Sequence, residues 1–170
     1  MSEQIGGLLN MNTLSKFLQL STTAIDNYLN SLKRSFHIAT ISPYFSNIRK
    51  EIKKMPKIYF LDLGLRNALL KNFNLPYYRQ DIGNLYENFV FRQFLDRLSL
   101  DEIHFWRTQQ QNEVDFILSD KYAYEVKYNL ANFTPSKYKK FMDLYPDIIF
   151  NLIYRIGKPE KSDRIFFRRL

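Results

Sequence analysis

Two strand-like runs joined by a short polar turn constrain the fold of this chain more than any other feature. Residues 112–118 (NEVDFIL) and 122–128 (YAYEVKY) are rich in β-branched and aromatic residues, and Ser119, Asp120 and Lys121 separate them. Such runs on either side of a short polar turn predict an antiparallel β-hairpin. Successive side chains of a strand point to opposite faces, and this alternation decides where the charged residues of the hairpin lie.

Three charged residues inside this hairpin suggest a metal site. Alternation places Val114 and Phe116 on one face of their strand and Asp115 on the other. It places Glu125 and Lys127 on the same face of the next strand, about 7 Å apart along it. Two carboxylates about 4 Å apart repel by about 4 kcal/mol at an effective dielectric constant near 20, and a divalent cation converts that repulsion into ligation. Oxygen ligands suit Mg²⁺ or Mn²⁺. We therefore expect Asp115 and Glu125 to hold metal, while Lys127 orients water or stabilises charge in the transition state.

A helix precedes the hairpin and carries a further candidate ligand. Residues 83–100 follow a period near 3.6, with Asn88, Arg92 and Asp96 together on one side. Glu87 falls inside the apolar stripe, where a carboxylate must be paired, metal-bound or protonated. We name Glu87 as a third catalytic and metal-binding candidate. The alternative is that Glu87 lies at the edge of the stripe and interacts favourably with the helix dipole.

The remaining C-terminal patterns complete a mixed architecture. Residues 102–108 form a predicted strand whose Trp106 is expected in the core, residues 135–146 a helix, and residues 147–156 and 164–170 two more strands. We expect a mixed sheet flanked by helices, of the α+β or α/β class. The alternative for the hairpin is an exposed edge of the sheet. There Glu125 and Lys127 would form a surface ion pair that stabilises the fold by about 0 to 1 kcal/mol.

The N-terminal half has the element order of a winged helix-turn-helix. Two helices are predicted over residues 13–20 and 22–34, with Ser21 as the N-cap of the second. Strands are predicted over residues 36–42 and 57–63, and a basic loop separates them. This order predicts a winged helix whose second helix reads a DNA groove and whose basic loop contacts phosphates.

Positive charge is concentrated in that half. The chain has 25 Lys and Arg against 17 Asp and Glu, a net charge of +8, and residues 1–80 carry +7 of it. A basic half indicates a polyanion such as DNA. The asymmetry predicts a winged-helix domain over residues 1–76 and a second domain over residues 77–170. The predicted DNA contacts are Thr22, Thr23, Asn27 and Lys33 on the second helix and Arg49, Lys50, Lys53 and Lys54 in the loop, which ends at Lys57.

Composition excludes several classes of protein. With no Cys and two His, the chain has no disulfide framework, thiolate zinc site or Cys nucleophile. It has no G-x-x-x-x-G-K-[ST] sequence, so no ATP site of that kind is expected. No apolar run reaches the 18 to 20 or so residues that span a bilayer, and the N-terminus lacks the features of a signal peptide. We expect a cytoplasmic protein without a membrane partner.

The hairpin resembles the PD-(D/E)XK nuclease superfamily. Val114-Asp115 corresponds to the PD element, without its proline, and Glu125-Val126-Lys127 corresponds to the (D/E)XK element. Longer blocks, among them KMPKIYFLDLG and NEVDF with EVK, resemble the C-terminal part of a prokaryotic AAA+ family ATPase. In that family a P-loop module is followed by a winged helix and a domain of unknown function that is similar to restriction-endonuclease folds. The resemblance spans residues 4–170 and implies a fragment or a stand-alone relative.

Three functional hypotheses follow. The first is a Mg²⁺-dependent phosphodiesterase that acts on DNA, associated with an AAA+ ATPase module in a longer protein. The second is a non-catalytic module that binds DNA or a protein through a degenerate nuclease fold. The third is a module that binds proteins alone, which predicts no affinity for DNA even at low salt.

Overall fold

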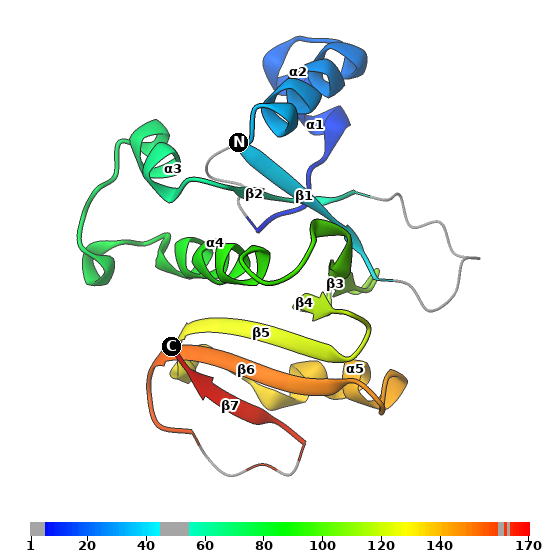
Figure 1. Cartoon of the computed structure of the whole chain (residues 1–170), viewed down its shortest axis with the longest axis vertical. Coiled ribbons are helices and arrows are strands. Elements are labelled where there is room, and N and C mark those ends of the chain that lie inside the picture. Colours follow the sequence, from blue (N-terminus) through cyan, green and yellow to red (C-terminus); the bar gives the residue numbers. More distant parts are fainter. Residues whose placement is uncertain (1–5, 45–54, 160–161, 163) are drawn as a thin grey trace.

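A computed structural model describes residues 6–44, 55–159, 162 and 164–170. A seven-stranded mixed sheet runs through it in the order β2-β1-β3-β4-β5-β6-β7 (Figure 1). The sheet is antiparallel from β3 to β5 and parallel from β5 to β7. The strands are β1 (Ile38–Pro43), β2 (Lys57–Phe60), β3 (Ile103–Arg107), β4 (Glu113–Leu118), β5 (Tyr122–Asn129), β6 (Ile149–Ile156) and β7 (Phe166–Arg169).

The helices predicted over residues 13–20, 22–34 and 83–100 are present, although the last ends earlier, at Leu95, whereas the helix over Leu63–Leu70 was not predicted. Ser21 Oγ accepts a hydrogen bond from the Ala24 N–H at 3.1 Å, which confirms Ser21 as an N-cap. The predicted helix over residues 135–146 is divided into a 3₁₀ turn, η5 (Pro135–Tyr138), and a short α-helix. The α-helices are α1 (Met11–Leu18), α2 (Thr22–Arg34), α3 (Leu63–Leu70), α4 (Ile82–Leu95) and α5 (Lys139–Leu144), and the 3₁₀ turn η2 (Pro76–Tyr78) precedes α4. No helix in the described part of the chain is long and apolar enough to cross a membrane.

The two N-terminal strands belong to the same sheet as the C-terminal strands. β1 pairs antiparallel with β2 and parallel with β3, where Ser42 lies opposite His104. Strands from residues 1–76 and from residues 77–170 share one sheet. The winged helix and the division after residue 76 stay predictions. Thr22, Thr23, Asn27 and Lys33 are exposed on α2 as predicted, whereas the positions of Arg49, Lys50, Lys53 and Lys54 lie outside the described residues.

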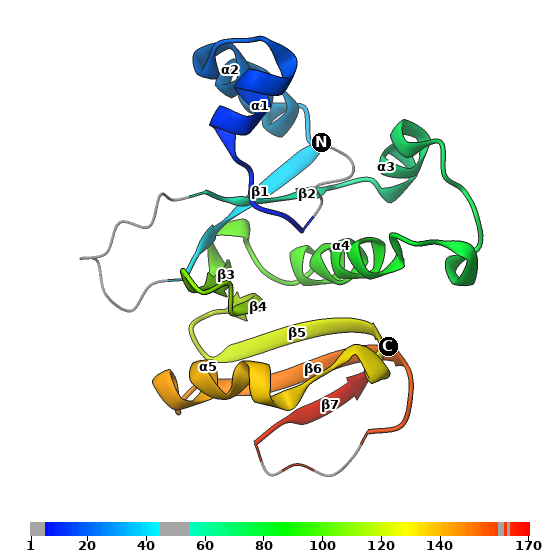
Figure 2. The same cartoon turned by 180° about the vertical axis from the view of Figure 1, so that it is seen from behind.

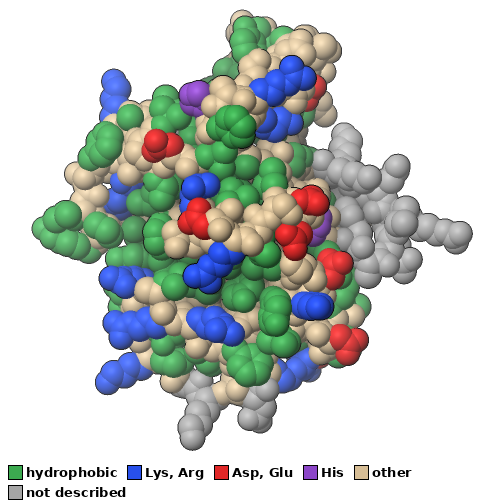
Figure 3. All heavy atoms as spheres, viewed as in Figure 1, with side chains coloured by type: hydrophobic (Ala, Val, Ile, Leu, Met, Phe, Trp, Pro, Cys, Tyr) green, Lys and Arg blue, Asp and Glu red, His purple; other side chains and the backbone are tan. Residues whose placement is uncertain are grey.

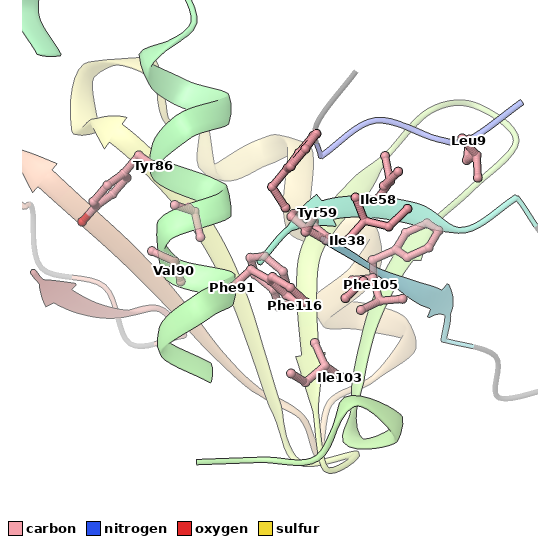
Figure 4. Close-up of a cluster of buried hydrophobic side chains, with 14 of the residues drawn as sticks. Leu9, Ile38, Ile58, Tyr59, Tyr86, Val90, Phe91, Ile103, Phe105 and Phe116 are labelled. Carbon is pink, nitrogen blue, oxygen red and sulfur yellow. The ribbon is translucent and has the colours of Figure 1, made fainter. Parts of the chain in front are cut away.

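Helices cover both faces of the C-terminal strands. The two views place α4 and α5 on opposite sides of this part of the sheet (Figures 1 and 2). On the α4 side, the ring of Tyr59 stacks on that of Phe91 at 4.3 Å and lies 5.6 Å from that of Phe116 (Figure 4). On the α5 side, Trp106 packs edge-on against Phe141 at 5.1 Å and is buried, which confirms its predicted place in the core.

The predicted hairpin is present, but its first strand contains a β-bulge. Ile117 lies opposite His104 and Val114 opposite Trp106, so two residues of β4 face one residue of β3. A bulge re-aims the side chains that follow it. The expectation that Val114 and Phe116 share a face is therefore wrong, because Val114 packs with Ile117 on the α5 side and Phe116 packs on the α4 side.

Asn88 departs from the polar face predicted for α4. It is fully buried, whereas Arg92 and Asp96 form an ion pair at 3.5 Å with half-exposed or exposed side chains. The amide of Asn88 accepts from the Phe60 N–H at 2.9 Å and donates to the Phe60 carbonyl at 2.8 Å. Because β2 is an edge strand of the sheet, Asn88 supplies the backbone partners that a further strand would have supplied.

Candidate functional site

The ladder between β4 and β5 stops where the predicted site begins. Its pairs run from Leu118 opposite Tyr122 to Phe116 opposite Tyr124. Beyond that pair, the backbone N–H of Val126 donates to Oδ2 of Asp115 at 2.9 Å. The carboxylate takes the place of a carbonyl partner, and the bulge in β4 aims it into this position. The end of the ladder therefore holds Asp115 in a fixed orientation beside Glu125 and Lys127.

Lys57 joins Asp115 to two further carboxylates. Its Nζ lies 2.6 Å from Oε1 of Glu113, 3.2 Å from Oε1 of Glu87 and 3.4 Å from Oδ1 of Asp115. The side chain is fully buried and also lies over the ring of Phe105 at 5.6 Å. The sequence counts Lys57 both with the basic loop and with the strand predicted over residues 57–63, and the structure places it in the strand. Its position on β2 directs it into the fold, and three carboxylates compensate for the lost hydration.

A buried carboxylate was expected to be paired, metal-bound or protonated, and the structure shows Glu87 paired. Besides the ammonium of Lys57, it accepts a hydrogen bond from the hydroxyl of Tyr59 at 2.7 Å. Burial and the nearby charge of Asp115 raise the pKa of Glu87 to about 7. Burial on its own would lower the pKa of Lys57, but the surrounding carboxylates overcome that effect and raise it well above its usual range. Lys57 therefore stays charged at neutral pH.

Glu125 and Lys127 come together on the other side of Asp115. Lys127 Nζ pairs with Oε1 of Glu125, which also accepts a hydrogen bond from the Tyr138 hydroxyl at 2.7 Å. Only 3% of Glu125 is exposed, so the alternative of a weak surface pair is wrong. Oε2 of Glu125 is buried and has no hydrogen-bond partner among the described residues. Burial and the charge of Asp115 raise the pKa of Glu125 to about 8.

Some members of the site escaped the sequence analysis. Glu113 and Tyr59 lie in predicted strands and Tyr138 in the helix predicted over residues 135–146, and no motif marks them as site residues. The alternation of β2 places Lys57 and Tyr59 on one face, which is the signal that could have found them. Gly6 was also missed: its φ is +71°, and a Cβ there would lie 2.8 Å from the carboxylate oxygens of Glu87. A glycine is thus required where the N-terminal segment crosses Glu87.

A groove of about 380 Å³ opens beside this cluster. Glu87 and Lys127 both line it, so each side chain borders the interior of the site and the surface. The rest of its wall comes from the segment before α4, the first turns of α4 and the end of β5. Within the described ranges, no group of three or more His, Cys, Asp or Glu side chains is arranged to hold a metal ion. The ammonium of Lys57 lies among the carboxylates Glu87, Glu113 and Asp115 instead.

Comparison with known proteins finds families and relatives whose functions are not known. Residues 1–76 match the domain of unknown function DUF8612, and residues 82–165 match the domain of unknown function DUF4143. The chain is 33% identical over 127 residues to the uncharacterized proteins Rv2008c of Mycobacterium tuberculosis and Mb2031c of Mycobacterium bovis. The match covers 72% of this chain but only 29% of each relative. No solved structure matches. The chain is therefore similar to part of longer proteins and, over two successive segments, to two domains of unknown function.

Proposed function

We propose that this chain is a DNA-binding phosphodiesterase module whose site lies at the open end of the β4–β5 ladder. One observation carries the proposal: Asp115, Glu125 and Lys127 converge there, and Glu125 keeps a buried oxygen without a partner. A buried carboxylate oxygen without a donor is costly. A bound divalent cation would satisfy this oxygen.

The donor set fits Mg²⁺ or Mn²⁺, with Asp115 and Glu125 as the ligands. Mg²⁺ in nucleotide enzymes is commonly held by one or two carboxylates and by substrate phosphates, so a cage of three protein ligands is not required. In this proposal Glu87 acts as a positioning residue, because it holds Lys57, and Lys57 in turn holds Asp115. When bound, the metal would polarise the phosphoryl group and lower the pKa of a water molecule.

The remaining roles follow from the contacts of each side chain. Tyr138 and the ammonium of Lys127 orient the carboxylate of Glu125 through its Oε1 atom. Lys127 also lines the groove, so its ammonium can donate to a phosphoryl oxygen of a bound strand. The Val126 N–H fixes Asp115. Every side chain assigned to the chemistry is thus held by a second group.

DNA is the proposed substrate because of charge and exposure. The net charge of +8 attracts a polyanion, and exposed polar side chains on α2, including Thr22, Asn27 and Lys33, are available to contact it. We also propose that an AAA+ ATPase module is the partner in longer proteins. The resemblance of the sequence to the C-terminal part of such ATPases supports this, as does the short share of the mycobacterial relatives that the chain spans.

Cleavage of a fluorescent duplex with Mg²⁺ or Mn²⁺ tests the proposal. The change Glu125→Gln removes the ionisable oxygen and is expected to abolish cleavage and a calorimetric Mn²⁺ binding event, with DNA affinity retained. Glu102→Gln is a matched control, because Glu102 is partly exposed, does not line the groove and accepts hydrogen bonds from Ser99 and Ser119. Equal cleavage by the wild type and Glu125→Gln would refute the proposal.

A second candidate is a non-catalytic module that binds DNA. One observation favours it: the ammonium of Lys57 already neutralises the largest group of carboxylates, as a structural ion cluster would. This candidate predicts salt-sensitive DNA binding that is the same with EDTA and with Mn²⁺, and no cleavage under either condition.

A further inference from the structure

A second cluster, separate from the carboxylates of the proposed site, contains two arginines and a single carboxylate, and one of the arginines, Arg79, also lines the groove. Arg66 of α3 and Arg79, just before α4, both contact Oδ2 of Asp81 at 2.8 Å. Arg79 also donates from Nε to Oδ1 of Asp81 at 2.9 Å and from Nη1 to the Asn72 carbonyl at 2.7 Å. The hydrogen bonds from Arg79, and to a smaller extent those from Arg66, lower the pKa of Asp81 to about 2. Two guanidinium groups share one carboxylate, so the cluster keeps one positive charge.

Arg66 is buried with an unused pair of donors. Its side chain has no exposed surface, and its Nη1 contacts Asp81 at 2.8 Å and Asn67 Oδ1 at 3.4 Å. Nε and Nη2 have no hydrogen-bond partner in the described part of the chain. These two nitrogens form one edge of the guanidinium, and their parallel N–H groups match two oxygens of a single oxyanion. Leaving both donors buried and unpaired is costly.

The cluster borders a pocket that can admit such an anion. The pocket has a volume of about 420 Å³, and Arg66 and Asp81 line it together with Asn74, Tyr78 and Gln80, which are exposed. Exposed side chains can change rotamer at little cost, so they can open a path to the buried edge. The same segment carries the exposed apolar side chains of Phe73, Leu75, Tyr77 and Tyr78. Hydrophobic side chains gather at the left edge of the molecule in Figure 3, the edge at which the segment between α3 and α4 lies in Figure 1.

We propose that this pocket binds a phosphoryl group through the Nε and Nη2 edge of Arg66. The ligand is inorganic phosphate or the terminal phosphate of a nucleic-acid strand, because an internal phosphate of a duplex cannot reach a side chain without exposed surface. Phosphate is favoured over a carboxylate ligand because the cluster keeps a positive charge and the whole chain carries +8. The proposal does not require the chain to cleave DNA.

The NMR signal of the Arg66 side-chain Nε–H tests the proposal, with its assignment made from Arg66→Lys. Titration with inorganic phosphate is expected to shift this signal, and Arg66→Lys is expected to weaken phosphate binding about tenfold or more through loss of the fork. Gln80→Glu places a negative charge on the exposed wall and is expected to weaken binding without unfolding the chain. Gln93→Glu, the same change at an exposed position of α4, is the control.

Two further titrations identify the source of the phosphate. An oligonucleotide with a 5′-phosphate that shifts the signal, when its 5′-hydroxyl counterpart does not, assigns the pocket to strand ends. A shift with inorganic phosphate alone assigns it to the free anion. The proposal is overturned if neither probe moves the Nε–H signal, if Gln80→Glu binds phosphate as the wild type does, or if acetate binds as tightly as phosphate.

Discussion

Replacing Lys57 by methionine is the most informative perturbation of this molecule. Methionine keeps most of the side-chain volume and removes the ammonium, so Glu87, Glu113 and Asp115 lose a cation at 3.2, 2.6 and 3.4 Å. Glu113 still contacts the guanidinium of Arg107 at 2.6 Å, and Asp115 still accepts the Val126 N–H. The energetic cost therefore falls mainly on Glu87, whose remaining hydrogen bond comes from a tyrosine hydroxyl.

The expected loss of stability is large and depends on pH. Removing one partner of a buried ion pair costs about 3–5 kcal/mol, because the other charge stays buried without compensation. The pKa of Glu87 is already raised to about 7 by burial and by Asp115, and loss of Lys57 raises it further. A raised carboxyl pKa means that stability is present at low pH and is lost as pH rises through the folded-state value. The destabilisation should therefore be greatest near pH 8 and small near pH 5.

Urea denaturation at pH 5 and pH 8, followed by circular dichroism, measures both features. Lys121→Met, at the exposed turn of the hairpin, is the matched control and is expected to change the free energy of unfolding by about 0.5 kcal/mol or less. Combining Lys57→Met with Glu87→Gln should recover part of the loss, since the neutral amide needs no cation. A loss that is equal at both pH values, or one below about 1 kcal/mol at pH 8, would refute the argument.

Three other predictions rest on separate features. The pKa of Glu125 is raised to about 8, so calorimetry should show Mn²⁺ affinity rising from pH 6 to pH 9 in the wild type, and a pH-independent affinity would contradict Glu125 as a ligand. Phe116→Ala should cost about 3–5 kcal/mol in urea denaturation because Phe116 is fully buried, whereas Phe73→Ala, at a position that is 71% exposed, should cost little. Asn88→Ala should lower the free energy of unfolding by about 2–3 kcal/mol, because it leaves both backbone groups of Phe60 unpaired. The control is Asn84→Ala, at an exposed position of α4. An equal loss in both variants would show that the edge of β2 does not need the hydrogen bonds of Asn88.

Short-range patterns predicted the hairpin and the meeting of its charged residues. Glu125 and Lys127 are two residues apart on one strand, and the turn fixes the register that brings Asp115 near them, so local rules were sufficient. The bulge was not predictable in this way, because it depends on how β4 pairs with β3. The sequence of β4 contains no glycine or proline that would mark its position. The alternation of side chains therefore failed at Val114, one residue from the site.

Lys57 shows the limit of reading charge from a sequence. It follows a run of basic residues, and a lysine in such a run is most often exposed. Its burial depends on contacts with Glu87 and Asp115, which lie 30 and 58 residues away along the chain. The pairing of β2 with β1 and of β1 with β3 brings these segments together. The alternation of β2 places Lys57 and Tyr59 on one face, but no local pattern could identify the carboxylates that meet them there.

The two lysines of the site divide the carboxylates unequally, and this division has a chemical consequence. Lys57 contacts Glu87, Glu113 and Asp115. Lys127 pairs with Oε1 of Glu125, whose second oxygen is buried and has no partner within the part of the chain that the structure describes. At neutral pH a proton is the occupant that the raised pKa of Glu125 favours. Under the proposed function, a divalent cation therefore displaces that proton rather than the ammonium of Lys57, which is fully buried and held by three carboxylates. Under the same proposal, the cation-binding end of the site is therefore the one that Glu125 and Lys127 form, and Lys127 connects it to the groove.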